Sequence, residues 1–432
     1  MPQNPNPYKF DGPLNLEDEE DKLVCIPRTK IVDKIVQKIK RGAYWAIMGS
    51  RQIGKTTLLR LVQNKYPDPY YIYFDFGISQ PGKEDFYRWL IDEFLSQLPT
   101  ELQNLPEDNG KNLIPELKFR NFLEKFALPE NKKIIFLFDE IDGLPLLGDF
   151  LRVWRKIYTE KPYKKGLKKY SVILTGSVDL IVQTIGPNSP FNIAQKYNIE
   201  DFSEEESKQL IETPFKKLDI TIEDEAKGHL ISQTSGHPQL LQHLCHILVE
   251  KQKKNITKDD IEFAINELFK TKSTLDTLHQ NMNTNTELAD LIRQILKGKK
   301  ITYYPYKQFS SFGVGAIKSD ENNFCEIRNE IYKKYLNEML TPKKEEEKKK
   351  EVEEKSQEEE EKEKKIEEKP QKVSVSIIPS PEKIENYARL STALGIIIGF
   401  FSVMFRFSPG IYGAASLAAL GLLLFLFSGK KK

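Results

Sequence analysis

One eight-residue stretch, GSRQIGKT at Gly49–Thr56, has the residue types and spacing of a phosphate-binding loop. Its glycines can adopt backbone angles closed to other residues, which brings amide N–H groups toward phosphate oxygens. Lys55 would place a positive charge beside the β and γ phosphates of a nucleoside triphosphate, and Thr56 would offer a hydroxyl to Mg²⁺. The residues expected to contact the nucleotide are Gly49, Ser50, Arg51, Gln52, Ile53, Gly54, Lys55, Thr56 and Thr57.

A second candidate is the run IIFLFDE, which is apolar until it ends in two acids at Asp139 and Glu140. This pattern predicts a buried strand whose carboxyl end carries the acids, and ligands of parallel sheets bind at that edge. Asp139 would hold Mg²⁺, often through water, while Glu140 would orient and deprotonate an attacking water molecule. Together the two motifs predict nucleotide binding with Mg²⁺ and catalytic roles for Glu140 and Lys55.

A third stretch, SVILTGSVD, predicts another buried strand that ends in small polar residues. Ser177, or Thr175 as the weaker candidate, could contact the γ phosphate or the attacking water. The alternative is that Ser177 only caps the end of the strand.

These motifs need a sheet to position them, and the chain supplies short apolar runs that alternate with helical patterns. Strands are expected at Tyr44–Met48, Tyr70–Phe76, Ile134–Phe138 and Ser171–Thr175. Helices are expected at Lys55–Tyr66, Lys83–Gln97, Gly148–Lys161, Glu204–Phe215 and Gln239–Lys253. Strands separated by helices of this length predict an α/β P-loop NTPase fold, a parallel sheet with helices on both faces.

The 432 residues are expected to fall into six segments. We expect an N-terminal segment (1–30), a P-loop ATPase core (31–200), a helical lid (201–280), a winged-helix-like domain (281–341), a charged Glu/Lys linker (342–385) and a transmembrane helical hairpin (386–429). The winged helix is expected because residues 285–340 contain an amphipathic helix, then a strand, a turn at Asp320–Asn323, a second strand and a helix.

The last segment differs in composition from the rest of the chain. Tyr387–Phe405 and Ile411–Phe427 are predominantly apolar, and each approaches the length needed to cross a bilayer. Basic residues flank both outer ends, which predicts a two-span hairpin with the ATPase domain and both ends in the cytoplasm. Residues 387–428 would then contact the membrane. The alternative is a buried apolar hairpin in a soluble oligomer.

Charge and cysteine content narrow the function classes. Residues 1–342 have no net charge once the linker and hairpin are set aside, so we do not expect nucleic acid as a partner. The three cysteines, Cys25, Cys245 and Cys325, lie far apart and do not form a disulfide framework. A zinc site at His243 and its neighbours is not expected either, because no second Cys/His pair exists.

The chain resembles the AAA-like ATPase domain family of multidomain bacterial signalling proteins, which is related to archaeal, initiator and STAND-type signal-transduction ATPases. The stretches that carry the resemblance are YKFDGPL, CIPRTKIVDKIVQKIKRG, GSRQIGKTTLLR, FDEID, TSGHPQLLQHLC and EIRNEIYKKYL, over residues 8–340. The resemblance implies ATP as the nucleotide, a choice that the residues alone do not make. It also implies that Arg28 lies near the base or the phosphates and that Pro238 presses against adenine. It places His237 near the phosphates, although His237 could instead be a simple helix-start residue.

AAA motors use arginines that act across subunits, a sensor arginine and a substrate-threading loop. Arg152 and Arg155 could reach a neighbouring subunit, but a solvated helix face is the favoured explanation for both. No arginine in the lid matches the sensor of AAA motors, and no substrate-threading loop is identifiable. Both departures count against an unfoldase motor.

Three functions remain open from the sequence. The first is a membrane-anchored ATPase that hydrolyses ATP slowly as a signalling or assembly switch, in which a homo-oligomer would gather the hairpins. The second is an ATP-binding winged-helix protein that binds DNA, although its turn SDENNFCE is acidic. The third is a scaffold that binds ATP without hydrolysing it. The protein partner and the activating signal are not identifiable from these residues.

Overall fold

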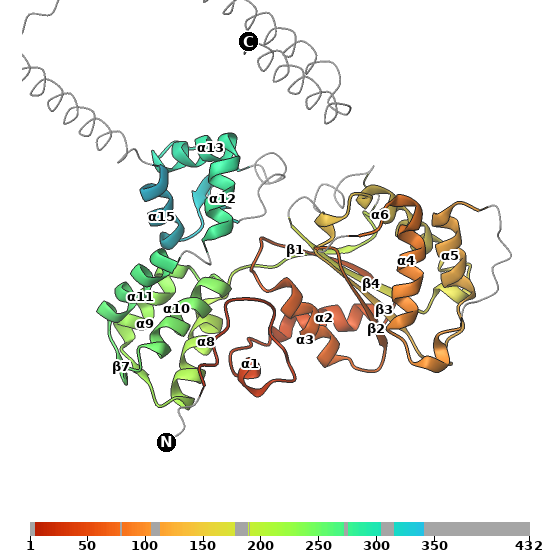
Figure 1. The fold of residues 1–432 in the computed structure, drawn as a ribbon, viewed down its shortest axis with the longest axis horizontal. Helices are drawn as coiled ribbons and strands as arrows, with labels where there is room; N and C mark the ends of the chain where they lie inside the picture. Colours follow the sequence, from red (N-terminus) through yellow and green to blue (C-terminus); the bar gives the residue numbers. More distant parts are fainter. Residues whose placement is uncertain are drawn as a thin grey trace, which may run out of the picture. The chain divides into compact units, whose positions relative to one another are not determined.

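Five parallel strands form a sheet in the order β2-β3-β4-β1-β5 (Figure 1). The strands are β1 (Tyr44–Met48), β2 (Tyr70–Asp75), β3 (Ile134–Asp139), β4 (Tyr170–Gly176) and β5 (Gln195–Asn198). This computed structural model describes residues 5–77, 80–104, 113–177, 189, 191–271, 275–303 and 315–340.

Side chains of each inner strand alternate between the two faces of the sheet, and both faces are apolar. On β3, Phe136 and Phe138 belong to one buried cluster while Ile135 and Leu137 belong to another. Helices α2 (Thr29–Ile39) and α3 (Lys55–Lys65) cover the isoleucine–leucine face. Helices α4 (Lys83–Ser96), α5 (Pro115–Lys125) and α6 (Leu147–Glu160) cover the aromatic face (Figure 1). The predicted parallel α/β P-loop NTPase fold is therefore confirmed.

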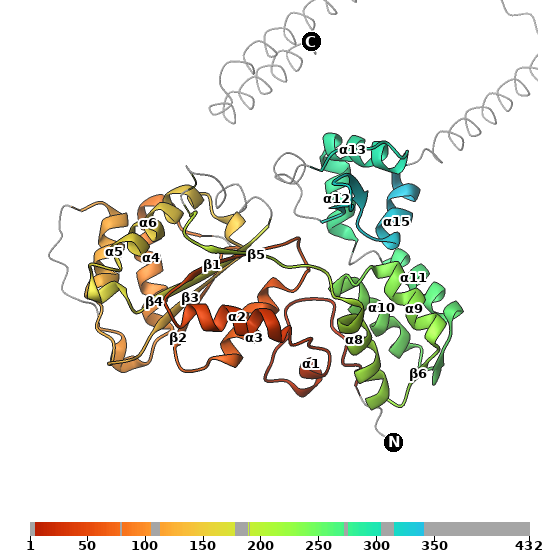
Figure 2. The same ribbon diagram turned by 180° about the vertical axis from the view of Figure 1, so that it is seen from behind.

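Strand β5 was not predicted, and it lies at the edge of the sheet beside β1 (Figure 2). Its sequence, QKYN, is mostly exposed and lacks the apolar run that marks the inner strands. Its pairing with β1 leads the chain to Ile199, whose N–H donates to Met48 O (2.8 Å). This edge strand thus ends beside the start of the phosphate-binding loop.

A group of helices follows the sheet: α8 (Glu204–Lys217), α9 (Asp224–Thr234), α10 (Pro238–Glu250) and α11 (Lys258–Thr271). Helix α8 begins with a capping box, in which the Ser203 and Glu206 side chains bond each other's backbone N–H. Two short strands, β6 (Thr221–Ile222) and β7 (Asn255–Ile256), pair beside these helices.

The next elements are α12 (Asp276–Thr284), α13 (Thr286–Leu296), an antiparallel hairpin of β8 (Ile317–Ser319) and β9 (Cys325–Ile327), and α15 (Glu330–Leu340). The hairpin turn lies where it was predicted: Asn323 N–H donates to Asp320 O (3.1 Å). One apolar cluster includes residues from α8 to α15. It therefore has members on both sides of residue 280, the predicted boundary between the lid and the winged-helix-like domain.

The N-terminal segment packs against the helices rather than the sheet. It contains α1 (Glu19–Leu23), and its Tyr8, Val24 and Ile26 are buried in the helical cluster. The Tyr8 hydroxyl donates to Leu210 O (3.0 Å) on α8. The remaining elements are three 3-10 turns, η1 (Thr100–Leu102), η2 (Ile141–Gly143) and η3 (Lys165–Leu167).

The predicted linker (342–385) and the predicted hairpin (386–429) lie outside the described residues. Within the described part of the chain, no helix combines the length and the apolar composition needed to cross a bilayer.

Candidate functional site

The loop between β1 and α3 is held in place by its glycines. Gly54 and Gln52 have left-handed backbone angles, with φ of 89° and 64°. A Cβ at Gly49 would lie 2.4 Å from Cγ2 of Ile199, so no side chain fits there. Gly49 N–H also donates to Gly176 O (3.2 Å) at the end of β4. The loop therefore needs glycine at two points for different reasons, one conformational and one steric.

Lys55 begins α3 and is folded back over the loop. Its ammonium donates to Gly49 O (3.0 Å) and Ser50 O (2.7 Å), and the residue is only 9% exposed. Burial lowers the pKa of Lys55, while the nearby carboxylates of Asp142 and Asp139 act in the opposite direction. A buried cation at the N-terminus of a helix is an arrangement that favours an anion such as phosphate.

Asp139 collects donors from two strands, a helix and the residue that follows β3. Its Oδ2 accepts from the Thr56 hydroxyl (2.6 Å) and the Tyr73 hydroxyl (2.9 Å). Its Oδ1 accepts from the Thr175 hydroxyl and from Glu140 N–H (3.1 Å). These bonds fix a carboxylate that is 2% exposed. Sequence reasoning missed Tyr73, because only its register beside β3 brings it to this aspartate.

Thr56 and Asp139 are the predicted magnesium ligands, and the structure brings them together. Both supply oxygen atoms, one as hydroxyl and one as carboxylate, at the N-terminus of α3. Mg²⁺ binds proteins through one or two carboxylates and completes its shell with water and substrate phosphates. The residues present therefore fit a magnesium ion.

Glu140 stands on a strained turn directly after β3. Its φ of 48° is left-handed, which is uncommon for a residue with a side chain and recurs at functional sites. A Cβ at Gly77 would lie 2.3 Å from Glu140 Oε2, so the Glu140 carboxylate packs against the backbone of Gly77 and leaves no room for a side chain there. The turn is held by a second close approach, in which a Cβ at Gly143 would lie 2.2 Å from Phe76 O.

The end of β4 places Thr175 and Ser177 differently. Thr175 is fully buried and bonds Asp139, whereas Ser177 N–H donates to a carboxylate oxygen of Asp142. Thr175 is therefore the residue of this strand joined directly to the magnesium-ligand pair. A contact between Ser177 and phosphate stays a prediction.

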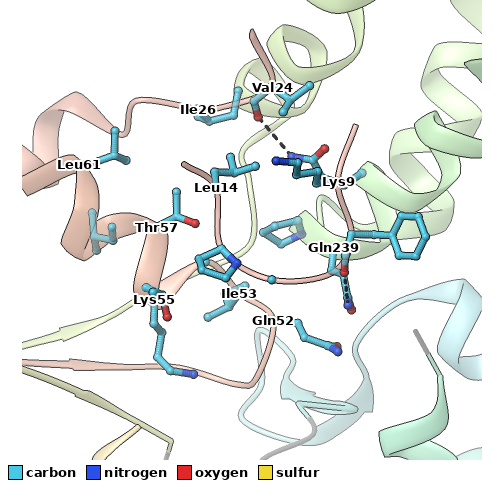
Figure 3. A pocket seen from close by; sticks show the side chains of 18 of the residues that line it. Lys9, Leu14, Val24, Ile26, Gln52, Ile53, Lys55, Thr57, Leu61 and Gln239 are labelled. Atoms are coloured by element: carbon cyan, nitrogen blue, oxygen red, sulfur yellow. Dashed lines mark hydrogen bonds between the residues drawn. The ribbon is translucent and has the colours of Figure 1, made fainter. Parts of the chain in front are cut away.

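A cavity of about 450 Å³ opens beside the loop (Figure 3). It is lined by the phosphate-binding loop and α3 with Glu140, by the N-terminal segment, by Phe202 in the segment before α8, and by the start of α10. Of the predicted binding residues, Gln52, Ile53, Gly54, Lys55, Thr56, Thr57, Glu140, Arg28 and Pro238 line it, whereas Gly49, Ser50, Arg51, Asp139 and Ser177 do not.

The cavity lining combines charged and apolar side chains. Lys55 and Glu140 are among the charged ones, with Lys9, Asp11 and Arg28, while Val24, Ile26 and Pro238 are among the apolar ones. A volume of this size suits a small-molecule site. The combination of a phosphate-binding loop with apolar lining residues matches a nucleotide, in which a charged triphosphate is joined to a planar base.

Arg28 forms part of the cavity wall. It precedes α2 with a left-handed φ of 43°, and its Nη2 donates to Glu200 O (3.0 Å). Its guanidinium lies over the Phe202 ring, 4.8 Å from the centroid. Arg28 thereby joins the N-terminal segment to the chain that leads from the sheet into the helices.

His237 is not among the residues that line the cavity, so the position near the phosphates that the resemblance implies stays a prediction. It is fully buried, and its Nδ1 accepts from Leu240 N–H (3.4 Å) to cap α10. Burial, helped by the positive charge of Arg328, lowers the pKa of His237 well below its usual range. The neutral ring then carries its proton on Nε2, 3.2 Å from the Tyr332 hydroxyl.

Arg328, which sequence reasoning did not single out, reaches the phosphate-binding loop from beyond β9. It forms a two-pronged ion pair with Asp201 (2.9 and 2.6 Å), and its Nη1 donates to the Ser50 hydroxyl. A Cβ at Gly315 would lie 2.3 Å from Ser50 Cβ, so backbone covers the loop here. The sequence feature that could have identified Arg328 is the motif EIRNEIYKKYL, which contains it.

The two arginines of α6 have local partners. Arg155 donates to Ser189 O (2.8 Å), and Arg152 pairs with Asp149 (3.2 Å) on its own helix. Neither contact tests a role across subunits. Within the described residues, no group of histidine, cysteine and acidic side chains could hold a metal ion through three of them, and the three cysteines are free.

Comparison with solved structures finds the same fold in the Walker-type ATPase of Pyrococcus abyssi, at 16% identity and a TM-score of 0.53, over 76% of this chain and 99% of that one. The Aeropyrum pernix ORC1 protein, solved in complex with DNA, is similar at 12% identity and a TM-score of 0.40, over 73% of this chain and 93% of that one. Likeness at that level does not bear on DNA binding here, so the expectation that nucleic acid is not a partner stays a prediction.

Among curated proteins, an uncharacterized WD repeat-containing protein of Synechocystis sp. is 24% identical over 237 residues, which are 51% of this chain and 20% of that protein. The chain thus spans about a fifth of that relative's length. A family model described as AAA-like domain matches residues 16–338. Because this match covers far more than half of its 432 residues, the chain belongs to the AAA-like domain family.

Proposed function

We propose that this chain is a slow ATPase switch held at a membrane. Its nucleotide state would be read by the winged-helix-like domain at residues 281–341. The observation that carries the proposal is the joining of Thr56, Asp139 and Thr175 in one bonded cluster beside Lys55 and Glu140. A cation, a pair of magnesium ligands and an exposed carboxylate at one sheet edge form the set that phosphoryl transfer to water requires.

Each residue has a separate role in this proposal. Thr56 and Asp139 would hold Mg²⁺, which when bound neutralises charge on the phosphate oxygens. Lys55 would exchange its carbonyl partners for phosphate oxygens. Glu140 would orient a water molecule and accept its proton, since its carboxylate faces the cavity on a fixed turn. Thr175 and Tyr73 position Asp139.

We interpret α8–α11 as the helical lid and residues 281–341 as the winged-helix-like domain. Arg328 would couple that domain to the nucleotide, because it is bonded to Ser50 of the loop and to Asp201 before the lid. A change in the loop on phosphate binding would strain these bonds. The charge-assisted pair is buried enough for that strain to matter, with Arg328 only 7% exposed.

The membrane part of the proposal rests on composition. Residues 387–428 form two apolar runs with basic residues at their outer ends, which supports a two-span hairpin with both ends in the cytoplasm. Alkaline extraction of membranes from expressing cells tests it. Retention of the chain in the membrane pellet supports the hairpin, whereas release into the supernatant rejects it.

Phosphate release from the purified full chain tests the enzymatic part. We expect slow turnover, below about one per second, as for switch-type P-loop proteins without an activator. Glu140→Gln should abolish most of this turnover while ATP still binds. Lys208→Gln, on an exposed ion pair of α8, is the matched control. Equal turnover in the chain and in Glu140→Gln would leave a nucleotide-binding scaffold instead.

A further inference from the structure

Lysines gather at the edge of the sheet where its strands begin. The segments that lead into β1, β2, β3 and β4 are residues 38–43, 65–69, 125–133 and 160–169. Together they hold eleven lysines and one arginine against three acidic residues, a net charge of +9. Residues 1–342 have no net charge, so the remainder of that range carries −9. The four segments are called the basic edge, and they concentrate positive charge in an otherwise acidic part of the chain.

Hydrogen bonds hold the segments of the basic edge side by side. Each bond joins a lysine ammonium to a backbone carbonyl oxygen of a different segment: Lys133 to Lys40, Lys132 to Asp68 (3.1 Å) and Lys161 to Gly42 (2.9 Å). Burial lowers the pKa of Lys161 to about 7, and the charge of Lys133 acts in the same direction. The basic edge is therefore one surface with a shared positive field.

Much of the charge on this surface faces solvent and is not neutralised. Lys40, Arg41, Lys132, Lys165 and Lys168 are exposed, and none of them has an ion-pair partner in the part of the chain that the structure describes. Exposed charge of one sign attracts a partner of the opposite sign and raises its local concentration. An anionic partner therefore fits the basic edge.

The same surface carries an exposed aromatic ring. Tyr163 lies between α6 and β4 and is 88% exposed. Pro162 precedes it in the chain, and Lys164 and Lys165 follow it. Tyrosine is enriched at membrane–water interfaces, where its ring lies at the level of the lipid headgroups. A tyrosine ring among lysines therefore suits a surface of anionic lipid.

We propose that the basic edge rests on a membrane surface of anionic lipids, with its lysines beside the headgroups and Tyr163 among them. The inference goes beyond the proposed function, because it gives the ATPase core a membrane contact of its own. It rests on that function in one respect, since the proposed hairpin would hold the core close to a bilayer. Each basic residue near an anionic leaflet adds modestly to binding, so the contact benefits from the high effective concentration of lipid around a tethered chain.

The residue types favour a lipid surface over nucleic acid. Eleven of the twelve cations of the basic edge are lysines, which act as compact point charges. Nucleic-acid recognition favours arginine, whose planar fork matches phosphate and stacks on bases, and the basic edge has one arginine, Arg41. Clusters of lysine beside a membrane-spanning segment are typical of contacts with anionic lipid.

This orientation would leave the nucleotide site accessible. The basic edge lies where β3 begins, whereas Asp139 lies where β3 ends. A strand of six residues spans about 20 Å, so that length of sheet separates the two. The carboxyl edge of the sheet, which carries the phosphate-binding loop, would then face away from the lipid.

The test is lysine acetylation of the full chain in nanodiscs, read by mass spectrometry. Discs of phosphatidylcholine alone are compared with discs in which about a third of the lipid is phosphatidylserine. We expect Lys40, Lys132 and Lys165 to be acetylated at least about threefold more slowly on the anionic discs at about 0.1 M salt, and equally fast on both discs at about 1 M salt. Lys254 and Lys270, whose side chains are 71% and 70% exposed, are internal controls outside the basic edge.

A double variant assigns the protection to the surface charge. Lys165→Gln combined with Lys168→Gln removes two exposed cations, and each lost charge should weaken the lipid contact by about fivefold. The protection of Lys40 and Lys132, which lie on other segments, should then fall below about 1.5-fold. Lys254→Gln combined with Lys270→Gln makes the same change in net charge and should leave that protection intact.

The outcomes separate this inference from the proposed hairpin. Equal acetylation on both kinds of disc, or protection that Lys254 and Lys270 share, would overturn the inference while the hairpin stands. If duplex DNA protects the same lysines of the chain in detergent and anionic discs do not, the basic edge is a nucleic-acid surface and the inference is wrong. If the chain does not enter neutral discs, the hairpin fails. Acetylation with anionic vesicles added to the chain then decides, and protection there supports the basic edge while its absence rejects it.

Discussion

Arg328 offers the sharpest perturbation, because three separate parts of the chain meet at its guanidinium. Arg328→Met keeps the aliphatic stem and removes every bond to Asp201, Ser50 and Gly315. The side chains of Arg328 and Asp201 are 8% and 21% exposed, so the lost cation leaves a largely buried carboxylate without its partner. Breaking a buried pair costs about 3–5 kcal/mol, and the partial exposure of Asp201 places this case near 3 kcal/mol.

The assay is chemical denaturation of the full chain in detergent, followed by tryptophan fluorescence. The matched control is Arg293→Met, which removes an exposed i,i+3 pair with Asp290 on α13. That pair should contribute less than about 1 kcal/mol. If Arg328→Met and Arg293→Met have the same effect on the free energy of unfolding, the structural reasoning is refuted.

A second readout tests the coupling rather than the stability. Because Arg328 is bonded to Ser50 of the loop, its removal should change the dissociation rate of bound ADP by about fivefold or more, the lower end of typical coupling energies. Arg293→Met should leave that rate unchanged. An unchanged rate of ADP dissociation in Arg328→Met would mean that the winged-helix-like domain does not read the nucleotide site.

Two further predictions concern stability. Burial lowers the pKa of His243 to about 4, so the unfolded chain binds a proton that the folded chain excludes between pH 6.5 and pH 4. The free energy of unfolding should fall by up to about 3 kcal/mol as the pH is lowered from 6.5 to 4. In His243→Phe, denaturation curves over the same pH range should no longer show this contribution. Gly143→Ala should destabilise by about 1–3 kcal/mol, because its Cβ would lie 2.2 Å from Phe76 O. Gly228→Ala, on α9 with open space around it, should instead stabilise by up to about 1 kcal/mol, and equal effects of the two substitutions in thermal melts would contradict the packing argument.

Local patterns predicted the sheet well because its inner strands are defined by their own residues. Tyr44–Met48 matches β1 at both ends, and Ile134–Phe138 falls one residue short of β3. Both runs are apolar throughout, as strands buried on two faces require. Gln195–Asn198 gave no such signal, since an exposed edge strand needs only backbone pairing.

The site was predictable in its motifs and not in its connections. The spacing from Gly49 to Thr56 and the acids at Asp139 and Glu140 are local features. The bond from Arg328 to Ser50 joins residues 278 positions apart, and the bond from Gln242 to Val24 joins residues 218 apart. Neither pairing leaves a periodic trace in the sequence, so only the folded chain could show them.

The central claim is that the loop at Gly49–Thr56 holds ATP, and equilibrium binding of radiolabelled ATP with Mg²⁺ to the full chain tests it most directly. The structure predicts about one nucleotide per chain, with affinity reduced at least about tenfold in Lys55→Ala. Lys65→Ala, at the far end of the same helix in an exposed pair with Asp33, should bind as the unaltered chain does. No saturable binding by the unaltered chain, or equal binding by Lys55→Ala, would contradict the claim.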